Sequence, residues 1–325
     1  MPNTMTACPL CGAGAPFRVY NPAPIACHDY ETMPEGSRLD QCASCRFIFL
    51  NPQPTPEESL AYEAVDEQWY PTEDMTEEDR YIHTVEARRA IEFVMRVQPV
   101  KGCLLDIGSN RGFLLNAARE AGYNAYGVEP TARTAEFSRR EFGVNVFNGV
   151  LEDNPYELGS FDTITLWHVL EHIPSVRPFV RKTAAMLKPD GVLFIQVPYL
   201  DYWPRPVHFN YFDCDSLMRV LAGVGLTVIA AEVEARNFLT IAATQRGRAS
   251  DTGPAGLGAW DAMALQAGRQ QKQLEQLEQK LAAQAAAQQA QYEELTRAVH
   301  NIYASIARRP WSRLMRVVRR VIPRS

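Results

Sequence analysis

Between residues 101 and 245, short apolar runs alternate with longer stretches that have helical periodicity. The runs are residues 103–107, 125–129, 144–147, 162–166 and 192–197, and the helical stretches lie near 112–121, 131–141 and 175–188. This alternation predicts βαβ units with parallel strands, so we expect the α/β fold class. Two further apolar runs, 226–233 and 238–244, follow each other closely and are expected to pair antiparallel at an edge of the sheet.

The other segments differ from this region in composition. We divide the chain into a Cys- and Pro-rich segment (1–52), an acidic connector (53–79), the α/β region (80–245), a flexible linker (246–259), a long helix (260–307) and a basic tail (308–325). The connector is inferred because residues 57–79 hold ten acidic residues and neither Lys nor Arg. A helix from about Glu78 to Val97 is expected to precede the first strand. The long helix has neither Gly nor Pro after Gly268.

Charge and hydropathy limit the possible classes of protein. The formal net charge of −5 is unevenly distributed: the tail has seven Arg and no acid, whereas residues 1–307 hold 26 basic and 38 acidic residues. No apolar run approaches the ~18–20 residues that cross a bilayer. The N-terminus lacks the basic and apolar regions of a secretory signal, so we expect a cytoplasmic protein. In that compartment, seven cysteines favour metal binding or free thiols over disulfides.

A glycine-containing turn follows the first predicted strand. Residues 106–112 read Asp-Ile-Gly-Ser-Asn-Arg-Gly and open a helix. The glycines allow a sharp turn close to a ligand, and the helix N-terminus offers free N–H groups, as in many nucleotide-binding proteins. The second strand ends at Glu129, where an acid suits the paired hydroxyls of a ribose. The alternative is an exposed acid that caps the next helix, but its place at the end of a strand favours a ligand.

Several motifs together resemble those of class I S-adenosylmethionine-dependent methyltransferases over roughly residues 80–245. They are DIGSNRG (106–112), GVEP (127–130), FDTITLWHVLEH (161–172), LKPDG (187–191) and HFNYFDCDSL (208–217). The resemblance implies a Rossmann-like seven-stranded sheet and S-adenosylmethionine as cofactor. It implies that the glycine turn holds the methionine part of the cofactor and that the acid after the second strand holds the ribose. Residues after the third and fourth strands would enclose the adenine and the sulfonium.

Carried onto this chain, the implied cofactor residues are Asp106, Gly108, Ser109 and Gly112, then Glu129 with Pro130, then Leu151 and Glu152, then Trp167 and His168. Two positions depart from the family pattern. Asn110 stands where a glycine is usual, and Val150 stands where an Asp often binds adenine.

Methyl transfer from a sulfonium needs an aligned acceptor and, where the acceptor is not already nucleophilic, a group that takes its proton. Histidine suits this step because its unperturbed pKa is about 6.5. His172, beside Glu171, follows the fourth strand, and His208 follows the fifth. We take His208, His172 and Glu171 as candidate catalytic residues; each histidine could instead have a structural role. Aromatic residues near His208 in the sequence could wall an acceptor pocket: Tyr199, Tyr202, Trp203 and Tyr211.

Four cysteines form two CxxC pairs, Cys8 with Cys11 and Cys42 with Cys45. Two such pairs complete the tetrahedral shell of Zn²⁺, so we predict a zinc ribbon whose zinc is structural. A redox CxxC would need only one pair, and Cys27-His28 offers an alternative donor. The 30 residues between the pairs can hold a β-hairpin. Methyltransferases with such a ribbon resemble sugar C-methyltransferases and their relatives in bacterial glycan pathways.

The long helix carries apolar residues at 3–4 spacing: Leu274, Leu277, Leu281, Tyr292, Leu295, Val299, Ile302 and Ile306. We predict a coiled coil that makes a homo-oligomer; the alternative is a solvated single helix. In the tail, residues 311–322 place Trp311 and aliphatic residues on one helical face and arginines on the other. This pattern predicts peripheral contact with an anionic membrane. A partner protein is the alternative, whereas the apolar face argues against nucleic acid.

These features lead to one main hypothesis and two alternatives. We predict methylation of a sugar, as a nucleotide sugar or a growing surface glycan, near the cytoplasmic face of the membrane. The first alternative is O-methylation of a small molecule such as a quinone-like or secondary-metabolite phenol. The second is a non-catalytic scaffold that recruits glycan enzymes through the coiled coil. A scaffold need not bind S-adenosylmethionine, so cofactor binding separates it from the two enzymes.

Overall fold

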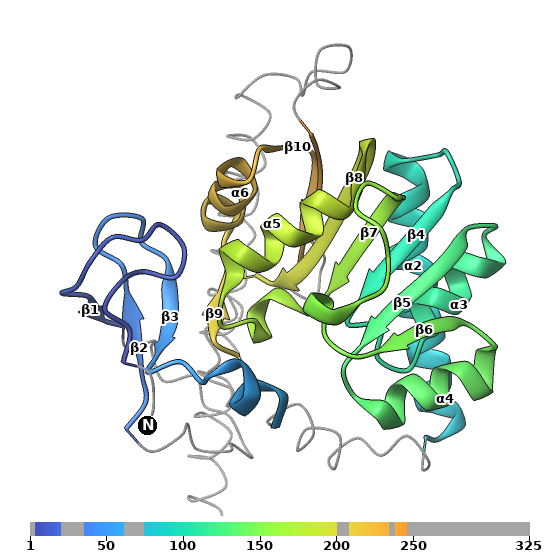
Figure 1. The fold of residues 1–325 in the computed structure, drawn as a ribbon, viewed down its shortest axis with the longest axis horizontal. Helices are drawn as coiled ribbons and strands as arrows, with labels where there is room; N and C mark the ends of the chain where they lie inside the picture. The colour runs from blue at the N-terminus through green and yellow to red at the C-terminus, as the bar shows by residue number, and fades with distance from the viewer. Residues whose placement is uncertain (1–3, 21–35, 62–74, 200–207, 234–237, 246–325) are drawn as a thin grey trace, which may run out of the picture. The chain divides into compact units, whose positions relative to one another are not determined.

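The computed structural model describes residues 4–20, 36–61, 75–199, 208–233 and 238–245 (Figure 1). The predicted linker, coiled coil and basic tail lie outside these residues, as do Cys27, His28, Tyr202 and Trp203. Within the described ranges, no helix is both long and apolar enough to cross a membrane.

Seven strands form one sheet in the order β10-β11-β8-β7-β4-β5-β6. In chain order they are β4 (Cys103–Ile107), β5 (Asn124–Glu129), β6 (Asn145–Asn148), β7 (Phe161–Trp167), β8 (Leu187–Pro198), β10 (Leu226–Val233) and β11 (Phe238–Gln245). Strands β4 to β8 pair in parallel, whereas β11 pairs antiparallel with both β8 and β10. The predicted seven-stranded sheet and its antiparallel edge are therefore confirmed.

Helices cover both faces of this sheet (Figure 1). The helices on one face are α2 (Glu77–Val97), α3 (Phe113–Glu120) and α4 (Ala132–Phe142), and those on the other are α5 (Val176–Met186) and α6 (Cys214–Gly223). Side chains of β8 alternate between the two layers: Val192 and Phe194 pack toward α2 and α3, whereas Leu193 and Ile195 pack toward α5 and α6. Because both layers are apolar, the central strands read as nearly continuous apolar runs.

Local interactions set where the elements begin. Helix α2 starts one residue before the prediction because Thr76 and Asp79 form a reciprocal capping box. Strand β8 starts at Leu187, five residues earlier than predicted, because Leu187 already pairs with Phe161 before a bulge. An ion pair of 2.8 Å between Nζ of Lys188 and Oδ2 of Asp162 stabilises this extension.

The Cys- and Pro-rich segment forms a second sheet, in the order β1-β2-β3-β9. Its strands are β1 (Arg18–Val19), β2 (Arg38–Gln41), β3 (Ile48–Asn51) and β9 (Asn210–Tyr211), all antiparallel. The antiparallel pair β1–β2 lies between the two CxxC pairs, where a hairpin was expected. Strand β9 comes from the α/β region, and its pairing with β3 was not predicted.

We call residues 4–20 and 36–51 the cysteine module. Its aromatic side chains do not form a separate core. Phe47 and Phe49 are buried in the same apolar cluster as Phe212 and Leu217, and the ring centroids of Phe47 and Phe212 lie 5.3 Å apart. The cysteine module is therefore packed as part of the α/β region.

Gly112 and Gly225 allow the cost of backbone strain alone to be compared with the cost of strain plus a steric collision. Both have positive φ, +76° at Gly112 and +85° at Gly225, but only a Cβ on Gly112 would collide, at 2.6 Å from Cβ of Ser138. We expect Gly112→Ala to lower the free energy of unfolding by about 2–4 kcal/mol, from strain and overpacking. Gly225→Ala should cost about 1–2 kcal/mol, from strain alone. Urea unfolding measures both variants, and equal losses would contradict the role of the collision.

Candidate active site and metal centre

The turn between β4 and α3 holds three residues in the left-handed region. The angle φ is +74° at Gly108, +46° at Asn110 and +76° at Gly112. Asn adopts this conformation more readily than other non-glycine residues, which explains why Asn110 can stand where a glycine is usual. A Cβ on Gly108 would lie 2.6 Å from Cγ2 of Val169. The glycines are thus required by packing within the chain as well as by the sharp turn.

Glu129, the last residue of β5, is buried, so it is not an exposed capping acid. Its Oε2 accepts a hydrogen bond from the N–H of Asn110 (2.7 Å), and its Oε1 accepts from the N–H of Thr131 (2.9 Å) and Oγ1 of Thr134 (3.1 Å). The carboxylate therefore ties the glycine turn to the start of α4, with Pro130 half-buried beside it. Burial raises the pKa of Glu129, and these bonds offset that effect only in part. Oε1 accepts two of these bonds and Oε2 accepts one, so Oε2 keeps a lone pair that could accept from a ribose hydroxyl.

Two further polar groups are buried at the same turn. Asp106 accepts a hydrogen bond of 2.7 Å from Oγ1 of Thr165 on the neighbouring strand. Burial, helped by the nearby charge of Glu129, outweighs this bond and raises the pKa of Asp106 to about 7. Oγ of Ser109 is buried and has no hydrogen-bond partner among the described residues. An unpartnered buried hydroxyl is costly, and this one lies against Gly127 of the neighbouring strand β5.

The remaining predicted cofactor residues follow β6 and β7. Leu151 is buried, whereas Glu152 beside it is exposed. Trp167 is half-buried on the side of α2 and α3. His168 has φ +55°, and its ring lies edge-on to that of Phe238 with 4.6 Å between the centroids. All four lie at the carboxyl ends of parallel strands, the edge at which open α/β sheets bind ligands.

A buried carboxylate and three histidines face one another after β7. Glu171 lies in a short 3₁₀ helix, η2 (Leu170–His172), with Nδ1 of His168 at 3.4 Å and Nε2 of His172 at 3.9 Å from its Oε1. The ring of His208, also buried, lies edge-on to that of His172, with centroids 5.0 Å apart. Burial opposes ionisation of Glu171, but the nearby imidazole of His168 and the charges of the three histidines outweigh it and lower its pKa to about 2. Neither carboxylate oxygen has a hydrogen-bond partner among the described residues.

The structure thus brings the three predicted catalytic residues together. The ligand atoms of Glu171, His172 and His208 all lie within 4.8 Å of one another. Such a cluster could accept a proton on an imidazole, with the carboxylate stabilising the charge, and its donor set could also hold a cation.

Two amide side chains that were not predicted from the sequence hold this cluster in place. Nδ2 of Asn210, in β9, donates to the backbone oxygens of Ile173 (2.8 Å) and Leu170 (3.3 Å). Nε2 of Gln53 donates to Oδ1 of Asn210 (3.2 Å). Strand β9 has only two residues, too few to give a periodic signal, and isolated amides in a sequence do not reveal their partners.

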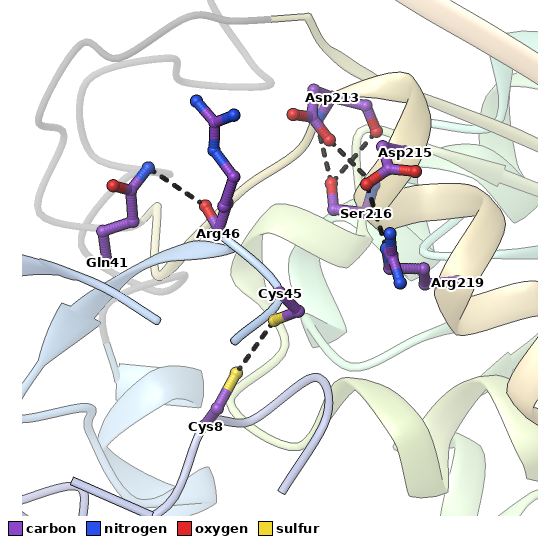
Figure 2. Close-up of polar contacts among 8 residues, drawn as sticks. All are labelled: Cys8, Gln41, Cys45, Arg46, Asp213, Asp215, Ser216 and Arg219. Atoms are coloured by element: carbon purple, nitrogen blue, oxygen red, sulfur yellow. Dashed lines mark hydrogen bonds and ion pairs between the residues drawn. The ribbon is translucent and has the colours of Figure 1, made fainter. Parts of the chain in front are cut away.

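The four predicted metal ligands converge, with all their sulfur atoms within 4.8 Å of one another. The Sγ atoms of Cys8 and Cys45 are 3.6 Å apart, and those of Cys11 and Cys42 are 3.7 Å apart; Figure 2 shows the first pair. Zinc bonded to sulfur at ~2.3 Å in a tetrahedron requires sulfur atoms about 3.8 Å apart. The four cysteines could therefore hold a zinc ion with little movement.

Both CxxC pairs have the same backbone turn. The residue after the second cysteine has positive φ, +76° at Gly12 and +63° at Arg46, and its N–H donates at 2.9 Å to the carbonyl of Cys8 or Cys42. Burial opposes ionisation of Cys42, but N–H groups of its own turn outweigh it and lower its pKa to about 7. Burial raises the pKa of Cys8 to about 12, so this thiol needs a bound cation to become a thiolate near pH 7.

Comparison with known proteins identifies the larger part of the described chain. Residues 79–231, which include the glycine turn, Glu129 and the histidine cluster, match a family model described as a methyltransferase domain. We refer to residues 79–231, which have a Rossmann-like α/β fold and match this family model, as the methyltransferase domain. The match begins inside α2 and leaves the cysteine module outside.

Individual relatives are more distant. A ubiquinone biosynthesis O-methyltransferase of Xanthomonas axonopodis pv. citri is 29% identical over 153 residues, covering 45% of this chain and 56% of the relative. The C-methyltransferase NovU of Streptomyces niveus is 28% identical over 156 residues, covering 43% of this chain and 37% of the relative. The chain thus spans about half or less of the length of these two curated relatives.

The chain also aligns with a solved structure. It is the 1,6-didemethyltoxoflavin-N1-methyltransferase of Burkholderia thailandensis, with 1,6-didemethyltoxoflavin and S-adenosylhomocysteine bound. It is 18% identical with a TM-score of 0.49, and the alignment covers 66% of this chain and 98% of that one.

The ionised state of Glu171 gives stability a defined pH dependence. Its pKa of about 2 lies below the value of 4.5 for the free side chain. The carboxylate therefore stabilises the fold above pH 4.5, and this contribution is lost as the pH falls toward 2. We expect Glu171→Gln to lower the free energy of unfolding by about 2–3 kcal/mol at pH 6, with a smaller difference from wild type at lower pH.

Denaturant unfolding between pH 3 and 6 measures this difference. Glu152→Gln, at an exposed glutamate, is the matched control and should match wild type throughout. A loss in Glu171→Gln that stays constant over this range would show that Glu171 acts through packing and not through its charge.

Proposed function

We propose that the protein is an S-adenosylmethionine-dependent methyltransferase. The observation that carries this proposal is Glu129, a buried acid at the end of β5 held against the glycine turn of the adjacent strand β4. The match of residues 79–231, which contain this turn, to a methyltransferase domain supports it. Asp106 supports it as well, since this buried acid begins the glycine turn to which the resemblance assigns the methionine part of the cofactor.

When bound, the cofactor supplies a methyl group activated by a positively charged sulfur. In this proposal Glu129 binds the ribose hydroxyls, and Ser109 and Asp106 bind the methionine part. His208 and His172 are the candidate proton acceptors for the methyl acceptor. The carboxylate of Glu171 stabilises either imidazole once it is charged.

For the acceptor we propose a sugar, either as a nucleotide sugar or on a growing glycan. The cysteine module supports this choice through its resemblance to the ribbons of sugar C-methyltransferases. A small phenol is the second candidate, favoured by the similarity to ubiquinone biosynthesis O-methyltransferases. An assay with nucleotide sugars, lipid-linked glycans and catechol-like phenols, read by product mass, decides between them. Methylation of phenols alone would reject the sugar.

Cofactor affinity tests the role of Glu129. Glu129→Ala should weaken S-adenosylmethionine binding by about 1–3 kcal/mol, the scale of a hydrogen bond to a charged group. Glu136→Ala, which removes an exposed glutamate of α4, is the control and should bind like wild type. Titration calorimetry below the melting temperature of both variants measures the affinities. Equal binding by all three proteins would contradict the assigned cofactor site, and wild type that binds no cofactor would favour the scaffold alternative.

We further propose that Cys8, Cys11, Cys42 and Cys45 hold a structural zinc ion. The sulfur separations support this assignment, and four thiolates leave no coordination position for a substrate.

Metal content tests this proposal directly. Protein purified without chelator should contain about one zinc per chain, and Cys42→Ser should lose both the metal and stability. Cys103→Ser, outside the cluster, should retain the zinc. Elemental analysis of the three proteins is the measurement, and metal-free wild type would reject the zinc site.

A further inference from the structure

The cysteine module is hydrogen-bonded to the segment that carries His208. Strand β3 pairs with β9, placing Phe49 opposite Asn210, and the N–H of Leu50 donates to the carbonyl of Phe209 at 2.9 Å. His208 lies immediately before these paired residues. Hydrogen bonds from the cysteine module therefore help to fix the backbone next to His208, in addition to contacts within the methyltransferase domain.

Strand β9 is also bonded to the turn that carries Glu171 and His172. The N–H of Phe209 donates to the carbonyl of Glu171 at 2.7 Å. The side-chain amide of Asn210 spans the same turn, because its two hydrogens point to the carbonyls of Leu170 and Ile173. These bonds fix the backbone of the carboxylate against the backbone of the histidine segment.

Gln53 completes the connection from the module. It lies two residues beyond β3 and is buried, and its Nε2 donates at 3.2 Å both to Oδ1 of Asn210 and to the carbonyl of Phe209. The amide hydrogens of Gln53 and Asn210 are thus all used in buried, directional bonds. Such bonds are hard to replace, since a buried amide that loses its partner gains no water in exchange.

We propose that Gln53 is a positioning residue for His208 and acts through its bonds to Asn210 and to the carbonyl of Phe209. In this assignment Gln53 holds Asn210, Asn210 holds η2, and together they set the place of the His208 ring beside His172. The proposal rests on the proposed function only in giving His208 a role in proton transfer. Its geometric content, the dependence of the ring position on Gln53, stands by itself.

Histidine ring signals of the full-length chain measure this dependence. The chain has six histidines, which can be labelled at Cε1 and assigned by single substitutions. Gln53→Met keeps the length of the side chain and removes both donors. It should shift the ring signals of His208 and His172 by more than their line widths. The signal of His83, which contacts Arg111 and Phe113 instead, should not move.

A matched variant controls for general loosening of the module. Asn51 is as buried as Gln53, but its side-chain bonds go to Asp40 and Met5, inside the module. Asn51→Leu should leave the His208 signal in place even where it lowers the melting temperature. An equal shift in Asn51→Leu, or no shift in folded Gln53→Met, would overturn the proposal.

A double variant tests the route through Asn210. Gln53→Met combined with Asn210→Leu should shift the His208 signal by less than the sum of the two single shifts, because the bond between the two side chains is lost in each single variant. Fully additive shifts would show that the bond between Gln53 and Asn210 plays no part in placing His208. If Gln53→Met does not fold, Gln53→Asn retracts the amide by one methylene and should give the same shift.

Cofactor binding separates this proposal from the proposed function. Gln53→Met should bind S-adenosylmethionine with wild-type affinity, since Gln53 contacts the histidine side of the site. Wild type that fails to bind the cofactor would reject the proposed function while the ring signals still decide the role of Gln53. With an acceptor that the wild type methylates, Gln53→Met should lower kcat ~10-fold or more and leave the KM for S-adenosylmethionine unchanged, as expected when a reacting group is misplaced. Shifted ring signals with an unchanged kcat would reject the role of His208 in proton transfer, whereas unshifted signals would reject the positioning role of Gln53.

Discussion

Three carboxylates are buried where the parallel strands end, and the local structure is arranged around the cost of burying them. N–H groups of two different turns compensate Glu129, a single hydroxyl compensates Asp106, and imidazoles surround Glu171. All three are similarly buried, yet the pKa is about 7 for Asp106 and about 2 for Glu171. The kind of partner therefore decides the charge, not the depth of burial. Asp106 can therefore ionise beside a bound cation, whereas Glu171 is already ionised beside the histidines.

The second constraint is that the cysteine module shares its core with the methyltransferase domain. Phe47 and Phe49 pack in one cluster with Phe212 and Leu217, and β9 completes the sheet of the module. A small sheet of this size buries too little apolar surface to be stable alone. Its stability therefore depends on the domain it packs against. In return, the module supplies hydrogen-bond donors to a segment of the domain that has little regular structure of its own.

The sequence was sufficient to predict features that depend on local patterns. Apolar runs and their spacing predicted all seven strands of the large sheet. The CxxC spacing predicted that Cys8 and Cys45 lie close together, as they do in the structure. Position at a strand end was enough to single out Glu129. Features that depend on distant partners were missed: the pairing of β3 with β9 joins residues more than 150 positions apart, and the role of Gln53 exists only because Asn210 lies beside it. The early start of β8 was missed for the same reason, since its partner Phe161 fixes it.

At the metal centre, too, the charge of a buried group depends on its partners. Burial raises the pKa of Cys8 to about 12, whereas the burial of Cys42 is outweighed by N–H groups of its own turn, which lower its pKa to about 7. Four sulfurs at these separations cannot all be charged unless a cation offsets their repulsion. A zinc ion would therefore release protons on binding and fix both turns together. The second turn leads directly into Phe47 and β3, so order at the sulfurs would reach β9 through a hydrogen-bonded sheet.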